Sequence, residues 1–156
     1  MSAWDELRKE IATERRYLHR EVNGYGPLLK KCRIRTPDLI ERAALGALLH
    51  SFYNGLENIF KRIAMACDGG LPEGGLWHRR LLDSMAQTRP NRPAVLGQET
   101  RKALRPYADF RHLFRHGYLA QLNWELMAEA VHGIPATLEQ VEADLDRFLA
   151  ALEEGD

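Results

Sequence analysis

Apolar residues recur along most of the chain every three or four positions, which is the spacing of a helix with one buried face. No segment shows the apolar–polar alternation of a half-buried strand. The helices predicted from this spacing cover residues 3–22, 36–68, 76–87, 99–115, 123–131 and 137–153. Helices of this length joined by short turns pack as an up-and-down bundle, so the sequence predicts an all-α, antiparallel helical bundle.

Glycine, proline and capping residues set the expected helix ends. Residues 23–27 contain two glycines and a proline and are expected to break the first helix, and residues 68–70 end the second. Thr36 is the predicted N-cap of the second helix, with Pro37 at its first position. Asn123 is the predicted cap of the fifth helix.

Three further positions carry expectations that a structure can test. Pro106 is expected to bend the fourth predicted helix or to mark its effective start, because proline removes a backbone donor. Tyr17 and Leu39 fall on the apolar sides of the first and second helices, so both are expected to point inward.

The composition is that of an ordinary globular protein, with 156 residues, 45% apolar and 28% charged. This length favours one domain over residues 1–156. No run approaches the roughly 20 apolar residues needed to cross a bilayer, and the N-terminus lacks a signal-peptide core, so a cytoplasmic location is expected. Cys32 and Cys67 lack metal-site spacing and are interpreted as reduced structural thiols.

The net charge is zero, but the charges are unevenly distributed. Residues 1–35 hold nine Lys and Arg against five Asp and Glu, residues 36–118 hold twelve against eight, and residues 119–156 hold one against nine. A face for RNA is therefore expected in the first three quarters of the chain, because basic side chains neutralise phosphates. Charged helix surfaces that bind no ligand explain the same counts. His78, Arg79 and Arg80 are candidates for contact with RNA, but a solvated helix start is the favoured interpretation.

The densest group of chemically active side chains lies at the end of the fourth predicted helix, around Gly117. It consists of Asp109, Arg111, His112, Arg115, His116 and Tyr118. His112 and His116 are four positions apart, as in a metal-chelating pair. No third ligand has matching spacing and the adjacent arginines would repel a cation, so no metal site is expected.

Two interpretations of this segment without a metal remain open. Cationic side chains suit the negative C-terminal end of a helix, so the segment is explained as a solvated helix end. The second interpretation is a ribonuclease site, in which a neutral imidazole takes the 2′-hydroxyl proton of RNA. An arginine would then hold the scissile phosphate and stabilise its additional negative charge. Spacing alone does not separate the two interpretations.

Arg111, His116 and Tyr118 form the pattern R-x4-H-x-Y, and His112 is the polar residue directly after its arginine. This pattern resembles the signature of the HepT-like subset of HEPN domains. The resemblance extends over roughly residues 40–150. The segments that carry it outside the motif are residues 50–60, 71–82 and 92–95.

The resemblance implies an all-α HEPN-type homodimer that cleaves RNA without a metal or other cofactor and leaves a 2′,3′-cyclic phosphate. It implies that His116 is the general base and Arg111 the phosphate clamp. It also implies a toxin, neutralised by a nucleotidyltransferase antitoxin of the MntA type that transfers AMP to Tyr118. AMP there would add bulk and negative charge where the RNA phosphate must lie. Transfer RNA and messenger RNA are both open as substrates.

Residues outside the motif are candidates for supporting roles. Tyr53 and Glu57 are four positions apart on the long second helix and share a face. They are interpreted either as a solvated or hydrogen-bonded pair or as residues that border the active cleft. Asp109 is placed to orient His112 or Arg111 from the previous turn, or to form a surface salt bridge.

Helix geometry restricts how the motif can work. Arg111 and His116 are five residues apart, which is about 140° around an ideal helix. Either His116 lies in a distorted last turn, or each residue works with the partner chain's copy in a dimer. The alternative function is a catalytically silent HEPN protein that acts as a scaffold or substrate-binding partner of a nucleotidyltransferase.

Overall fold

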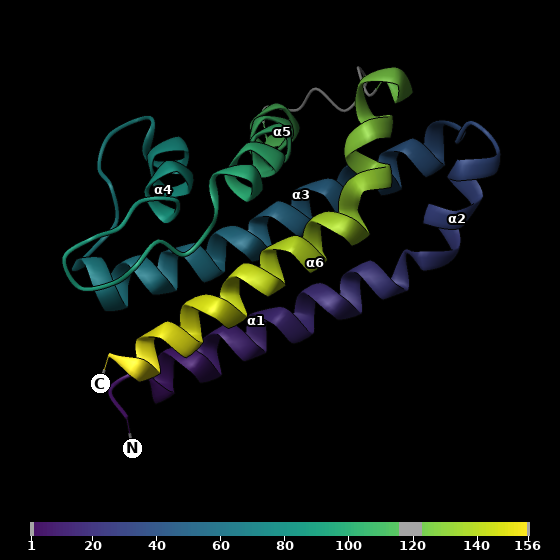
Figure 1. Cartoon of the computed structure of the whole chain (residues 1–156). Coiled ribbons are helices and arrows are strands. Elements are labelled where there is room, and N and C mark those ends of the chain that lie inside the picture. The colour runs from purple at the N-terminus through teal and green to yellow at the C-terminus, as the bar shows by residue number, and fades with distance from the viewer. Residues whose placement is uncertain (1, 116–122, 156) are drawn as a thin grey trace.

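The computed structural model describes residues 2–115 and 123–155, with the side chains of residues 112–115 left out of the description. Within these residues the chain forms helices and no β-sheet, which confirms the all-α prediction. The helical elements are α1 (Asp5–Gly24), α2 (Gly26–Ile34), α3 (Leu39–Ile63), the π-helical turn η1 (Ala64–Asp68), α4 (Trp77–Met85), α5 (Gln98–Arg115) and α6 (Trp124–Glu154) (Figure 1).

Three long helices, α1, α3 and α6, lie side by side, and α1 runs opposite to the other two (Figure 1). Ion pairs between α1 and α6 show that these two helices are antiparallel. Arg8 near the start of α1 lies 3.0 Å from Glu153 near the end of α6, and Arg15 lies 2.8 Å from Asp146 one to two turns earlier. Both termini therefore lie at the same end of the bundle (Figure 1).

Helices α4 and α5 pack on the side of α3 that faces away from α1 (Figure 1). Helix α5 is seen almost end-on in that view, so it crosses α3 steeply. The rings of Phe52 on α3 and Tyr107 on α5 meet edge to face with centroids 5.2 Å apart. The Tyr107 hydroxyl also links α5 to α6, because it donates a hydrogen bond to the Ala130 carbonyl at 2.7 Å. Helix α3 thus contacts every other long helix and forms the centre of the core.

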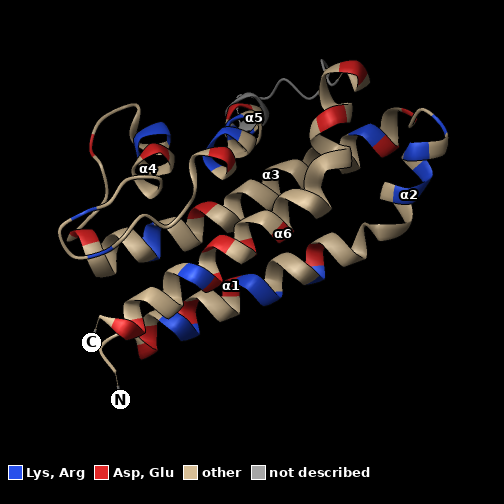
Figure 2. Ribbon diagram, in the orientation of Figure 1, with Lys and Arg blue, Asp and Glu red and all other residues tan. Residues whose placement is uncertain are grey.

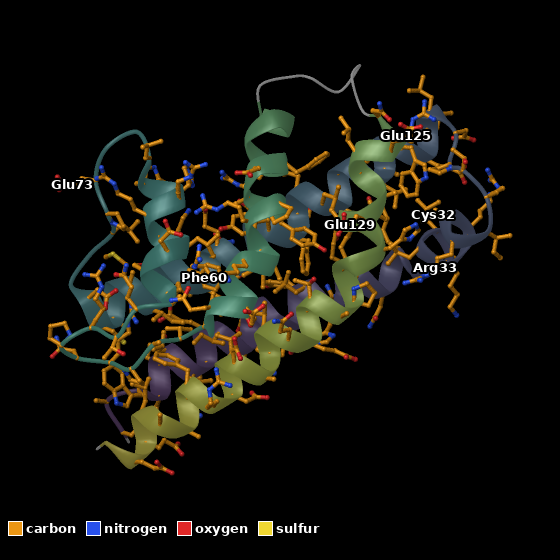
Figure 3. The ribbon with its side chains drawn as sticks, turned by 45° about the horizontal axis from the view of Figure 1, so that its top comes forward. Cys32, Arg33, Phe60, Glu73, Glu125 and Glu129 are labelled. Carbon is orange, nitrogen blue, oxygen red and sulfur yellow. The ribbon has the colours of Figure 1, made fainter. Side chains whose placement is uncertain are left out.

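The core is apolar and is centred on α3, where Phe60 lies fully buried inside the bundle (Figure 3). Two inward expectations were wrong, because Tyr17 is 59% exposed and Leu39 is 64% exposed. Tyr17 is about 100° around α1 from the buried Leu18 and falls just off the face that meets α3. Leu39 is the first residue of α3, and the next residue, Ile40, is exposed as well.

The two cysteines are buried free thiols, as the interpretation of structural cysteines requires. Cys32 lies on α2 (Figure 3), and its thiol donates to the Leu29 carbonyl at 3.3 Å. Cys67 lies in the π-helical turn. Burial raises the pKa of both thiols, which keeps them protonated and unreactive.

Helix α2 and the start of α3 correct the expected helix ends. The glycine-rich break after α1 lasts only one residue, because Pro27 fits the first turn of a new helix. The N-cap of α3 is Asp38 and not Thr36. The Asp38 carboxylate accepts from the Glu41 amide at 2.8 Å, and the Glu41 carboxylate accepts from the Asp38 amide at 3.0 Å. This reciprocal capping box satisfies two terminal donors, which Thr36 cannot do.

The last two predicted helices are one continuous helix, α6, so the predicted break between them was wrong. Asn123 is the N-cap as predicted, with its side chain accepting from the Glu125 amide at 2.9 Å. Pro135 lies inside α6, which bends in its upper part (Figure 1). Pro106 likewise lies within α5, eight residues after its start, and does not begin that helix.

A buried arginine connects the loop between α4 and α5 to the π-helical turn η1, which follows α3. Arg92 has no exposed side-chain surface, and its Nε and Nη2 atoms donate to the two oxygens of Asp68, each at 2.9 Å. Its remaining donors reach the carbonyls of Gln87, Ser84 and Pro93 at 2.9–3.1 Å. This network fixes the loop that leads into α5.

We expect Arg92→Ala to lower the free energy of unfolding by about 3–5 kcal/mol, because it leaves the Asp68 carboxylate and three carbonyls without their donor. Arg89→Ala is the matched control, since Arg89 is exposed in the same loop, and should change stability by less than about 0.5 kcal/mol. Urea denaturation of both variants measures the difference. Equal stability of the two variants would contradict the anchoring role.

Candidate functional site

Arg111 lies in the last described turns of α5 and packs against α3. It is only 9% exposed. Its Nη2 atom lies 3.7 Å from Oε1 of Glu57. Its Nε atom is buried and has no hydrogen-bond partner among the described residues. The guanidinium is thus paired with one carboxylate at ion-pair distance, and its Nε donor is left unused inside the protein.

Glu57 and Arg92 are the two most deeply buried charged residues described, and Glu57 keeps only 1% of its side-chain surface exposed. Besides Arg111, its carboxylate contacts His78 of α4, whose Nδ1 atom lies 2.9 Å from each carboxylate oxygen. A buried carboxylate is costly unless it is paired and hydrogen-bonded. Glu57 is paired from two sides, so helices α3, α4 and α5 converge on one carboxylate.

Tyr53 lies one turn before Glu57 on α3 and is 1% exposed. Its hydroxyl has no hydrogen-bond partner among the described residues. Burial raises the pKa of Tyr53, the Glu57 charge raises it further, and the Arg111 charge opposes the shift. The phenol is therefore neutral at physiological pH. Although Glu57 and Tyr53 share a face of α3, Glu57 bonds to His78 and not to Tyr53.

A pocket of about 460 Å³ opens beside this cluster, between α4 and α5. It is lined by Gly75, Leu76, His78, Arg79, Arg105, Ala108 and Asp109. Figure 2 shows basic and acidic residues mixed on α4 and α5, whereas the charged residues of α6 are mainly acidic. Arg105 is held at the pocket by Asp83, whose Oδ1 lies 3.2 Å from its Nη2. Glu73, in the loop before α4, lies at the outer edge of the molecule (Figure 3).

The structure brings together three of the residues selected from the sequence, Tyr53, Glu57 and Arg111. Asp109 is exposed and lines the pocket, and Glu57 is the carboxylate that pairs with Arg111. His112 continues α5, but its side chain lies outside the description. His116 and Tyr118 also lie outside the described residues.

His78 is the residue that sequence reasoning did not place at the site. It lies 21 positions after Glu57 on a different helix, so no helical spacing relates the two. The only sequence signal was a histidine beside two arginines at a helix start, which fits a solvated surface equally well. Its contact with Glu57 is a product of tertiary packing.

Two absences concern only the part of the chain that the structure describes. In that part, no three or more His, Cys, Asp or Glu side chains are grouped so that they could hold a metal ion. Likewise, none of the described helices is long and apolar enough to cross a membrane.

A family model described as HepT-like protein matches residues 44–152 of the chain. The chain belongs to the HepT-like family. The match begins within α3 and ends near the end of α6, so it includes Glu57, His78 and Arg111. It confirms the resemblance identified from the R-x4-H-x-Y pattern. Neither the curated proteins nor the solved structures provide a significant match to this HepT-like chain.

We expect Glu57 and Arg111 to be energetically coupled. A double-mutant cycle with Glu57→Gln and Arg111→Gln should give an interaction energy of about 0.5–3 kcal/mol by urea denaturation, because the two charges share a buried environment. The control cycle pairs Glu57→Gln with Arg80→Gln, since Arg80 is exposed and donates to the Glu73 carbonyl. That cycle should be additive within about 0.5 kcal/mol. Additivity in both cycles would show that the Glu57–Arg111 contact contributes nothing.

Proposed function

We propose that this HepT-like protein is a metal-independent endoribonuclease and the toxin of a toxin–antitoxin pair. The observation that carries the proposal is the family match over residues 44–152, which spans the whole R-x4-H-x-Y segment. The packing of the described part supports it, because Arg111 is oriented by a buried carboxylate beside an open pocket. A solvated helix end would not need such a partner.

The reaction uses the 2′-hydroxyl of RNA as its nucleophile. His116 removes the hydroxyl proton, and the 2′-oxygen attacks the adjacent phosphorus. A 2′,3′-cyclic phosphate forms as the bond from phosphorus to the 5′-oxygen breaks, and the 5′-oxygen takes up a proton and leaves as a hydroxyl group. Arg111 binds the phosphate and stabilises the negative charge that accumulates on it. Glu57 holds the guanidinium in place from the buried side. Charge stabilisation by Arg111 and proton transfer by His116 together require no metal ion.

The proposed active form is a homodimer. Residues 111 and 116 are about 140° apart on an ideal helix, so one straight helix cannot direct both toward one phosphate. Two copies related by a two-fold axis provide each site with residues from both chains. This arrangement agrees with what the resemblance to HepT-like HEPN proteins implies.

The proposed regulator is a nucleotidyltransferase antitoxin of the MntA type, which transfers AMP from ATP to the Tyr118 hydroxyl. Tyr118 is two positions after His116, so the adenylate would lie where the RNA phosphate must bind. Its negative charge and bulk would both oppose RNA binding. Modification of Tyr118 would therefore switch the nuclease off without unfolding it.

Cleavage of total cellular RNA in EDTA tests the nuclease. The wild-type protein should cut RNA with the metal chelated, and His116→Ala should lose the activity because the general base is gone. His19→Ala is the matched control, because His19 is half exposed on α1 and pairs with Glu142 of α6. Intact RNA from folded, unmodified wild-type dimer would instead favour the catalytically silent scaffold or substrate-binding partner.

Incubation with the cognate nucleotidyltransferase and ATP tests the regulation. Mass spectrometry should show increments of about 329 Da on Tyr118, together with loss of RNA cleavage. Tyr118→Phe should remain unmodified and resist inactivation. Neutralisation of the wild-type protein without any added mass would show that the antitoxin acts by docking alone.

A further inference from the structure

His78 is held in a fixed orientation on α4. Its Nδ1 atom is bound to the buried Glu57 carboxylate at 2.9 Å, and its ring lies against that of Trp77 with centroids 3.6 Å apart. Lys61 also contacts the Trp77 ring, with its Nζ atom 5.3 Å from the ring centroid. With Nδ1 occupied, Nε2 is the ring nitrogen left for other chemistry.

The open side of this imidazole meets the pocket. His78 keeps 30% of its side-chain surface exposed, whereas Glu57 keeps 1%. The ring is therefore buried where it touches Glu57 and accessible elsewhere, and His78 itself lines the pocket of about 460 Å³. Nε2 and Nδ1 lie on different sides of an imidazole ring, so a group bound in the pocket can reach Nε2.

His78 and Arg111 are linked through a single oxygen atom. Oε1 of Glu57 lies 2.9 Å from His78 Nδ1 and 3.7 Å from Arg111 Nη2. The proposed phosphate clamp and a second imidazole therefore stand on either side of one carboxylate. In the proposed reaction, the leaving oxygen of a phosphate bound by Arg111 would have to lie at the pocket that His78 lines.

The pocket has the composition expected of a subsite for one nucleotide. Arg79 and Arg105 supply positive charge for a phosphate, and Leu76 and Ala108 supply apolar surface for a base. Arg79 makes no ion pair within the described residues, and Asp83 fixes the guanidinium of Arg105. The charged groups that surround His78 are Glu57 and Lys61 on α3, Arg79 on α4, and Arg105, Asp109 and Arg111 on α5.

We propose that His78 is a further catalytic residue of the nuclease and acts as the general acid for the leaving nucleotide, which the pocket binds. This inference rests on the proposed ribonuclease function. As the 2′-oxygen bonds to phosphorus and the bond from phosphorus to the 5′-oxygen breaks, Nε2 of the His78 imidazolium gives its proton to that 5′-oxygen. His116 gains one proton and His78 loses one, and exchange with water restores both.

A leaving group that needs no proton separates this role from a structural one. The test uses an RNA that the wild-type protein cleaves, with the bridging 5′-oxygen at the cleaved bond replaced by sulfur, because a thiolate leaves without protonation. In His78→Asn, the amide nitrogen can keep the bond to Glu57, but the position of Nε2 is empty. We expect His78→Asn to slow cleavage of the oxygen-linked RNA by about 10²–10⁴-fold and to cleave the sulfur-linked RNA at nearly the wild-type rate.

The ratio of the two rates comes from one preparation, so a loss of folded protein lowers both rates equally and leaves the ratio unchanged. His116→Ala should be impaired on both RNAs, and His19→Asn on neither. If His78→Asn does not fold, His78→Gln serves as the second variant, since its amide cannot release a proton and the same change in ratio is expected.

Two results would overturn the role of His78. These are an equal loss on both RNAs, which marks a structural contact, and no loss on either RNA. In both cases the wild-type and His116→Ala proteins still behave as a nuclease and its inactive variant, so only this inference fails. No cleavage by the wild-type protein of either RNA would overturn the proposed function and the role of His78 with it.

Discussion

The arrangement of α3, α4 and α5 depends on the need to pair one buried carboxylate. Glu57 lies in the second half of α3, where only 1% of its side-chain surface is exposed. Moving a carboxylate from water into such surroundings costs several kcal/mol unless opposite charge and hydrogen bonds replace its hydration. Arg111 and His78 supply these from the other two helices. The docking of all three helices is thus tied to the geometry of a polar cluster.

An apolar side chain in place of Glu57 would fill the core without this cost, and buried ion pairs are often no more stabilising than hydrophobic substitutes. Stability therefore gives no reason for the carboxylate. Orientation does, because Glu57 fixes one edge of the Arg111 guanidinium and one nitrogen of the His78 ring. In the proposed active site, both groups would then lose less side-chain entropy when RNA binds, which is the benefit of a preorganised site.

Features that depend on local sequence were predictable, and those that depend on distant contacts were not. The helix class, the Asn123 cap and the helix end at residues 68–70 follow from spacing and capping chemistry within a few residues. The continuous α6 escaped prediction because tertiary packing tolerates a bend at Pro135. The motif pointed to Arg111, and the helix pattern to Tyr53 and Glu57. His78 could not be found this way, because only the fold brings α4 against Glu57.

Counts of charged residues in the sequence also cannot show which cations are already paired in the folded protein. The excess of basic residues in the first three quarters of the chain suggested that a face for RNA lies there. In the structure many of these cations are already paired, as Arg15 is with Glu142 and Asp146, and Arg92 with Asp68. A paired cation must break or share its contact to bind a phosphate, so its contribution to RNA binding is reduced. For the proposed nuclease, the potential to consider is therefore the local one at the pocket beside His78, which Arg79 lines without an ion pair to any described residue.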